Sequence, residues 1–133
     1  MMPVFADSFY LFAILNPTDA AHEKAMAFSQ TQDVPIITTV WVLTELADGL
    51  SASSNRRAFH LILEELRADP LHTIVPASQV LFEKGVELYG ARGDKQWSLT
   101  DCISFVVMGE HGLTEALTGG HHFEQAGFTV LLA

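Results

Sequence analysis

The sequence predicts an α/β fold in which a parallel sheet of about five strands lies between two layers of helices. Short apolar runs alternate along the whole chain with longer stretches of helical pattern, which is typical of a parallel sheet covered on both faces. The 133 residues are enough for one domain with a substantial core. Hydrophobic residues make up 49% and charged residues 17%, a balance that excludes a disordered chain.

The predicted strands are five short apolar runs, each bounded by residues that favour turns or helix starts. They cover residues 2–7, 35–38, 72–75, 113–117 and 128–132. Helical pattern fills the intervals between them. The helices are expected over residues 8–15, 20–31, 40–50, 56–68, 77–91, 98–111 and 121–126. No repeat, low-complexity tract or linker divides the chain, so the predicted domain is 1–133.

Several helix boundaries have recognisable chemistry. The turn at 16–19, Asn-Pro-Thr-Asp, has the residues that begin a helix, and the polar stretch at 51–55 breaks one. Ser98 and Asp101 have the spacing of a capping box, with Asp in place of the usual Glu. Gly112 is expected to close that same helix.

The charge balance limits the possible functions. The net charge is −9, from 16 acidic against 7 basic residues, which argues against broad nonspecific binding to nucleic acid or to an anionic membrane. A nuclease is still compatible, because a bound metal ion would offset part of this charge locally. No apolar stretch is long enough to span a membrane, and the first residues lack the basic region of a signal peptide. Cys102 is the single cysteine, so there is no internal disulfide or cysteine zinc cluster, and a cytoplasmic setting is expected.

Three carboxylates lie in apolar surroundings. Asp7 ends the first apolar run, Glu45 lies inside an apolar helix, and Asp101 opens another. A carboxylate is costly to bury without a partner, so three of them suggest a shared positive partner. The simplest partner is a divalent cation that prefers oxygen ligands, Mg²⁺ or Mn²⁺.

The predicted fold can bring these acids together. In parallel α/β sheets, sites form at the carboxyl ends of the strands, where Asp7 and Thr118 are expected. Asp101 is near a helix N-terminus, which favours negative charge, and Glu45 flanks the apolar face of its helix. Asp7, Glu45 and Asp101 are therefore the candidate catalytic and metal-binding residues. Thr118, Ser8 and Asp94 are candidates to support them.

Each acid also has a purely structural explanation. Asp7 could cap the next helix, Glu45 could be a solvated helix residue, and Asp101 could be an N-terminal helix charge. The adjacent His121 and His122 do not make a tetrahedral zinc site, and packing or capping by His122 is the favoured interpretation.

Four segments, in this order, resemble the PIN-domain ribonucleases, especially the VapC-type toxins of bacterial and archaeal toxin–antitoxin pairs. The first is the early Asp followed by an apolar helix, and the second is the pair Thr44-Glu45. The third and fourth are longer and more specific. The four segments cover residues 7–11, 44–45, 97–105 and 116–128.

The resemblance implies a three-layer α/β/α PIN domain that hydrolyses RNA with Mg²⁺ or Mn²⁺ held by Asp7, Glu45 and Asp101. It also implies an RNA substrate, a cognate antitoxin protein and a homodimer.

The sequence does not fit two other doubly wound classes that have acidic sites. A receiver domain requires adjacent acidic residues after the first strand. A metal-dependent phosphatase of the Asp-x-Asp type would want an acid where this chain has Phe9.

The chain departs from the family pattern at one position. The family offers a fourth carboxylate two residues before the closing His-Phe pair, and here that position is Gly120. The site must then rely on three carboxylates. This leaves two functions open, a weakened endoribonuclease and a catalytically inactive PIN-like module that binds RNA or an antitoxin.

Overall fold

The computed structural model describes residues 2–31 and 33–133; Met1 and Gln32, both within the predicted domain, lie outside the described residues. Five strands of the described chain form one sheet in the order β3-β2-β1-β4-β5, and all four pairings are parallel. The strands are β1 Val4–Ala6, β2 Ile36–Thr39, β3 Thr73–Val75, β4 Glu115–Leu117 and β5 Thr129–Val130. The predicted α/β class with a five-stranded parallel sheet is confirmed.

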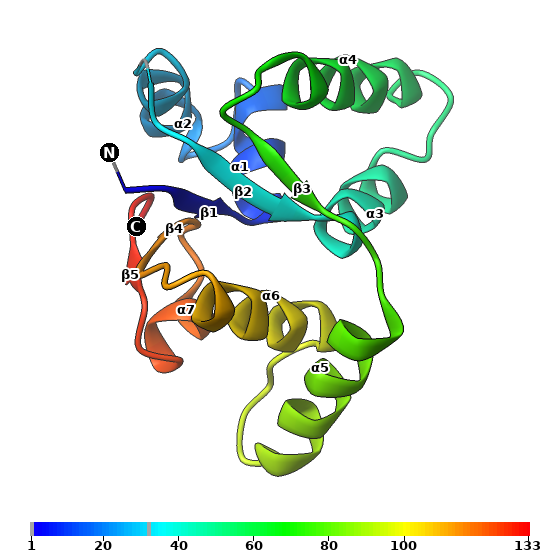
Figure 1. Ribbon diagram of the computed structural model, residues 1–133. Coiled ribbons are helices and arrows are strands. Elements are labelled where there is room, and N and C mark those ends of the chain that lie inside the picture. The colour runs from blue at the N-terminus through cyan, green and yellow to red at the C-terminus, as the bar shows by residue number, and fades with distance from the viewer. Residues whose placement is uncertain (1, 32) are drawn as a thin grey trace.

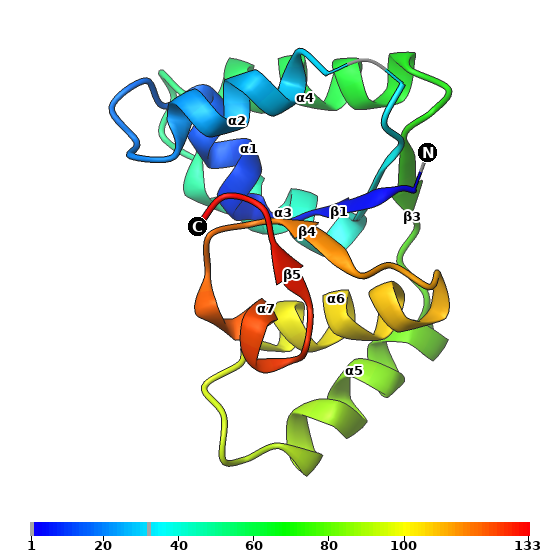
Figure 2. The ribbon, with the colours of Figure 1, turned by 90° about the vertical axis from the view of Figure 1, so that its left-hand side faces the viewer.

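The described residues contain seven helices, which lie on both sides of this sheet. They are α1 Ser8–Leu15, α2 His22–Ser29, α3 Val40–Gly49, α4 Arg56–Ala68, α5 Gln79–Ala91, α6 Leu99–Glu110 and α7 His121–Gln125. Figure 1 shows α1, α2 and α4 over one face and α6 and α7 under the other, with α5 outside α6. The view turned by 90° in Figure 2 shows the same three layers. The fold is therefore the predicted α/β/α arrangement.

Two predicted helix ends are formed as expected. The Ser98 hydroxyl accepts a hydrogen bond from Asp101 N at 3.0 Å, and the Asp101 carboxylate accepts one from Ser98 N at 3.2 Å, so the capping box is complete. Gly112 has φ +66°, a backbone conformation that favours glycine, and it ends α6. Helix α4 has the bounds that the sequence predicts.

Other predicted boundaries were wrong by one or two residues. Strand β4 begins at Glu115 rather than at 113, because Leu113 N still bonds to Met108 O at the end of α6. Helix α5 begins at Gln79 because Ser78 is its N-cap, accepting a hydrogen bond from Leu81 N at 3.2 Å. These errors come from caps, which decide where a helix starts independently of hydrophobic pattern.

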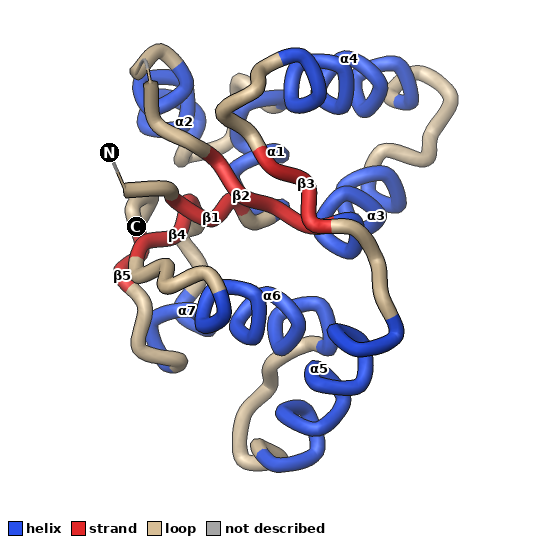
Figure 3. Tube along the Cα trace, viewed as in Figure 1, coloured by secondary structure: helices blue, strands red, loops and turns tan. Residues whose placement is uncertain are grey.

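The central strand is buried on both faces. Val4, Phe5 and Ala6 are 3%, 0% and 0% exposed, as expected for a strand between two helical layers. Figure 3 shows the short strands running between these layers. Beneath the sheet, the centroid of the Phe123 ring in α7 lies 4.9 Å from that of Phe105 in α6 and 6.1 Å from that of Phe5. This aromatic packing fixes α6 and α7 against the strand that leads to Asp7.

Among the described helices, none has the length and apolar character needed to cross a membrane.

Candidate functional site

The carboxyl ends of β1 and β4 lie side by side. Ala6 pairs with Leu117, so the residues that follow, Asp7 and Thr118, leave the sheet together. Thr118 Oγ1 is 3.0 Å from Asp7 Oδ2, and Gly120 N donates to Thr118 Oγ1 at 3.2 Å. A hydroxyl has one proton to give, so the bond from Gly120 leaves the Thr118 proton directed to Asp7.

Glu45 reaches the same end of the sheet from α3. That helix starts directly after β2, where the Thr39 hydroxyl accepts a hydrogen bond from Val42 N at 3.1 Å. Ser8, the first residue of α1, donates its hydroxyl hydrogen to Glu45 Oε1. Asp7 and Ser8 are neighbours, so this bond places the Glu45 carboxylate beside the start of α1.

Asp101 is the third residue of α6 and contacts α7 through His122. Its Oδ2 atom accepts the capping bond from Ser98 N and lies 2.9 Å from Nδ1 of His122. No sequence pattern pairs His122 with an acid, because the contact depends on how α7 packs against α6. The one available signal was that His122 follows Gly120 by two residues in the closing segment.

The three acids are close enough to influence one another electrostatically. Asp7 is 9% exposed, and its burial raises the pKa of its carboxyl from 3.8 to about 6. The Thr118 hydrogen bond opposes this rise, and the charges of Asp101 and Glu45 add to it. The structure therefore brings the three predicted acids to one end of the sheet, where Asp101 and Glu45 both repel the charge of Asp7.

Lys84, Arg92 and Lys95 form ion pairs with other acids, Glu110 and Asp94. Among the described residues, no Lys or Arg forms an ion pair with Asp7, Glu45 or Asp101. Asp94, a predicted supporting residue, is exposed and pairs with Arg92, whose Nε atom is 3.0 Å from its carboxylate. No contact described in the structure joins Asp94 to the three acids, whereas Ser8 and Thr118 each donate to one of them.

The donor chemistry fits a hard divalent cation. Within the described residues, no three His, Cys, Asp or Glu side chains are grouped tightly enough to hold a metal ion by themselves. Mg²⁺ usually keeps several waters and contacts one or two carboxylates, so a looser set of oxygen donors still suits it. The unpaired negative charge at the end of the sheet is the feature that such an ion would offset.

Gly120 leaves space beside Asp7 and Thr118. It is the N-cap residue of α7, with φ −76° and ψ 139°, values that any residue adopts. A Cβ atom built there would meet Thr118 Oγ1 at 3.5 Å, an ordinary contact. Neither backbone conformation nor space therefore requires glycine at this position.

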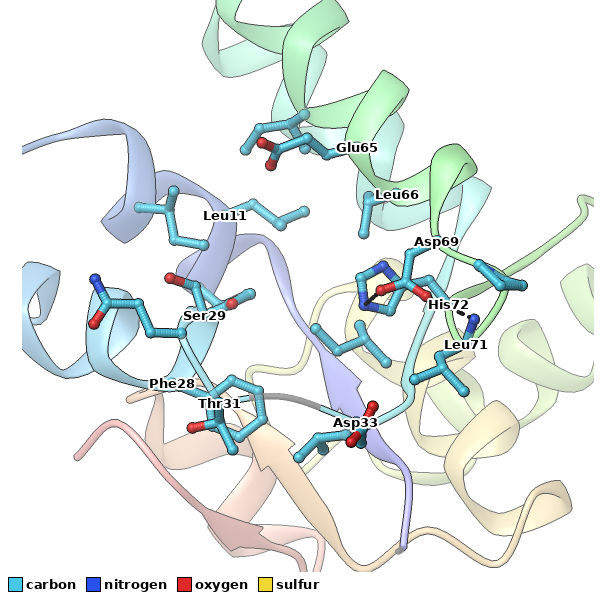
Figure 4. A pocket seen from close by; sticks show the side chains of 17 residues that line it. Leu11, Phe28, Ser29, Thr31, Asp33, Glu65, Leu66, Asp69, Leu71 and His72 are labelled. Atoms are coloured by element: carbon cyan, nitrogen blue, oxygen red, sulfur yellow. Dashed lines mark hydrogen bonds and ion pairs between the residues drawn. The ribbon is translucent and has the colours of Figure 1, made fainter.

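A separate cavity of about 820 Å³ is lined by residues of α1, α2 and α4 and of the segments that lead into β2 and β3 (Figure 4). Leu11, Ile62 and Leu66 contribute to its apolar lining, and Asp33, Glu65 and Asp69 are its acidic lining residues. No Lys or Arg lines it among the described residues. The cavity is therefore apolar and acidic, and it is distinct from the three-acid site.

Comparison with known proteins gives relatives of the same length. The chain is 29% identical over 128 residues to the 23S rRNA-specific endonuclease VapC20 of Mycobacterium tuberculosis, covering 94% of this chain and 95% of that protein. The crystal structure of VapC20, described as a sarcin–ricin loop cleaving toxin, superposes with a TM-score of 0.83 at 24% identity, covering 95% of this chain and 96% of VapC20. No known protein-family profile matches the chain.

Two complexes have the same fold at lower identity. FitAcB from Neisseria gonorrhoeae gives a TM-score of 0.66 at 18% identity, covering 98% of this chain and 96% of that one. VapBC2 from Rickettsia felis, bound to a DNA fragment from its promoter, gives a TM-score of 0.67 at 14% identity, covering 98% of this chain and 97% of that one. At these identities the likeness concerns the fold alone.

The parallel sheet and its two helical layers form the same fold as the VapC20 toxin. The resemblance to VapC-type toxins of the PIN-domain family that the sequence indicates is confirmed by these comparisons.

Proposed function

We propose that this chain is an endoribonuclease of the VapC type that hydrolyses RNA phosphodiester bonds with Mg²⁺ or Mn²⁺. One observation supports the proposal most: the charges of Asp101 and Glu45 both act on the buried Asp7 carboxyl, and no Lys or Arg in the described chain pairs with any of these acids. The relative that matches 94% of the chain is an endonuclease specific for 23S rRNA, which makes structured ribosomal RNA the first substrate to test.

Asp7, Asp101 and Glu45 are the residues that would hold the ion. When bound, such an ion supplies positive charge for the phosphate oxygens and makes water more acidic. The hydroxyls of Thr118 and Ser8 fix one oxygen of Asp7 and Glu45, so these carboxylates need little reorganisation on binding. Hydrolysis of this kind needs no covalent nucleophile from the protein.

Gly120 favours a second candidate, a PIN-like module that binds RNA or an antitoxin without cleaving. The space beside Thr118 lies where the family has its fourth acid, and glycine cannot supply an oxygen side chain there. Cleavage assays separate the two candidates, because a binding module would retain RNA or its partner without turnover.

We further propose an antitoxin partner with a basic and apolar segment. Structural neighbours of the chain include VapBC2 and FitAB complexes. The cavity in Figure 4 has the complementary chemistry, since Leu11 and Ile62 line it together with the acidic Glu65 and Asp69. A cationic amphipathic helix or strand would meet both kinds of side chain at once.

The homodimer also stays a proposal. Helix α5 lies outermost beneath the sheet (Figure 1) and exposes Phe82, Val86 and Tyr89 by 37%, 39% and 54%. Their spacing places them on one face of the helix. A second copy of this chain would cover such a stripe.

Cleavage of RNA tests the main proposal. A labelled ribosomal RNA fragment containing the sarcin–ricin loop is incubated with the protein in Mn²⁺, in Mg²⁺ and in EDTA, and a scrambled RNA of equal length is the substrate control. We expect cleavage in either metal, none in EDTA, and at least a 100-fold loss in Asp7→Asn and Asp101→Asn. Metal-independent cleavage, or equal cleavage by these variants, would refute the proposal. RNA binding without turnover at high Mn²⁺ would support the binding module.

A further inference from the structure

His122 makes a contact that helix capping does not require. The capping box of α6 is already complete with Ser98 and Asp101, yet Asp101 Oδ2 also lies 2.9 Å from His122 Nδ1. An ionised carboxylate can only accept hydrogen bonds, so Nδ1 is the donor. The Asp101 and His122 side chains are 17% and 31% exposed, so water competes only partly for this bond.

The three acids share one arrangement. Thr118 donates to Asp7 Oδ2, Ser8 donates to Glu45 Oε1, and His122 donates to Asp101 Oδ2. In each case the donor and the acid that it holds belong to different segments of the chain. In Asp101 both donors, Ser98 N and His122 Nδ1, engage the same oxygen, so Oδ1 is the atom left for a ligand.

We propose that His122 is a positioning residue of the acidic site: its Nδ1–H holds Asp101 Oδ2 so that Oδ1 stays available to a metal ion or its water. The inference rests on the proposed function, which supplies the metal. Hydrogen-bond donors to a metal-binding carboxylate orient it, and losing one typically costs about 10- to 100-fold in metal affinity or activity.

The competing explanation is that His122 simply attaches α7 to α6. Helix α7 has other attachments that do this. Phe123 is 1% exposed and packs against Phe105, and Gln125 accepts a hydrogen bond from Trp97 Nε1 at 3.0 Å. These contacts do not involve His122, so α7 should stay in place when the His122 imidazole is removed.

Two amide variants give the sharpest test. In His122→Asn the amide nitrogen occupies the place of Nδ1, whereas in His122→Gln it occupies the place of Nε2, one atom further out. Mn²⁺ affinity is measured by calorimetry, and kcat and KM are measured for RNA cleavage. We expect His122→Asn to stay within about threefold of the unmutated protein and His122→Gln to lose about tenfold or more in Mn²⁺ affinity and kcat. KM for RNA should change little, because Asp101 acts on the metal.

Two controls decide the outcome. His121→Gln alters the exposed neighbouring imidazole, whose centroid is 4.6 Å from that of His122, and should bind Mn²⁺ normally. In an Asp101→Asn background, His122→Gln should cause no further loss; an equal loss there would show a structural role and overturn the inference. Normal Mn²⁺ binding by His122→Gln would also overturn it and leave the proposed function intact. If the unmutated protein neither binds Mn²⁺ nor cleaves RNA, the proposed function fails and the inference fails with it.

Discussion

The Thr118 hydroxyl donates to the Asp7 carboxylate across 3.0 Å, although the two residues are 111 positions apart in the chain. The bond is fully buried on the Thr118 side, where the exposed fraction is 0%. It partly offsets the cost of burying Asp7 but does not cancel it, because the pKa of Asp7 still rises to about 6. The site is therefore held together at some cost in stability when no cation is present.

The first prediction follows from this raised pKa. A carboxyl that holds its proton more firmly in the folded chain contributes stability that is complete below its unfolded pKa of 3.8 and is lost as the pH rises through about 6. The shift of roughly two units corresponds to about 3 kcal/mol. In EDTA, Asp7→Asn should therefore be more stable than the unmutated protein by about 1–3 kcal/mol at pH 7, with little difference near pH 3.5. Urea unfolding at both pH values measures this, and a difference that does not depend on pH would contradict it.

The second prediction concerns metal and thermal stability. A cation that binds the folded chain alone stabilises it by about 2.7 kcal/mol at 100 times its Kd. We expect millimolar Mn²⁺ or Mg²⁺ to raise the Tm, and Asp7→Asn and Asp101→Asn to blunt the rise. Glu110→Gln is a suitable control, because Glu110 pairs with Lys84 away from the site. An unchanged Tm of the unmutated protein in millimolar Mn²⁺ would count heavily against the metal site.

Much of this arrangement could be predicted from sequence because it depends on local rules. The alternation of strand and helix predicts the parallel sheet, and strand ends in such a sheet meet at one edge, which is why Asp7 and Thr118 were expected there. The capping box is likewise a short-range pattern, since Ser98 and Asp101 belong to one helical turn.

The contacts that could not be predicted depend on packing between distant segments. His122 reaches Asp101 because Phe123 and Phe105 fix the position of α7 under α6, and no short-range pattern encodes that geometry. The raised pKa of Asp7 likewise follows from burial by several elements together. Asp94 had suitable chemistry in the sequence, but its neighbour Arg92 holds it in an exposed ion pair.

The third prediction concerns association. If the exposed stripe on α5 is covered by a second copy, light scattering should report twice the monomer mass at micromolar concentration. Val86→Lys, in the middle of the stripe, should shift the protein to monomer, because a charge would be buried without a partner. Leu61→Lys alters a residue of α4 that is 48% exposed and should leave the dimer intact. A monomer at all micromolar concentrations would rule out the homodimer.

The last prediction concerns Gly120 and its neighbour Gly119, which differ sharply in their surroundings. A Cβ at Gly119 would lie 2.6 Å from Phe9 Cζ and 3.2 Å from Leu132 O, whereas one at Gly120 meets Thr118 Oγ1 at an ordinary 3.5 Å. Gly119→Ala should therefore destabilise the fold, by about 1–3 kcal/mol for overpacking, and Gly120→Ala should not. Thermal unfolding of the two variants compares them directly.

Because the space at Gly120 is open, Gly120→Asp should add a fourth carboxylate to the site without strain. One additional charge-assisted ligand is worth on the order of 1–3 kcal/mol, roughly tenfold to a hundredfold in Mn²⁺ affinity. The unmutated protein should then cleave RNA slowly at low metal and recover partly at high metal, and Gly120→Asp should cleave faster at both. Without metal the same variant should be less stable, since a fourth negative charge would join Asp7, Glu45 and Asp101. Adding Asp101→Asn should abolish the gain. Equal Mn²⁺ affinity and equal cleavage by the two forms would show that position 120 does not contribute a metal ligand to the site.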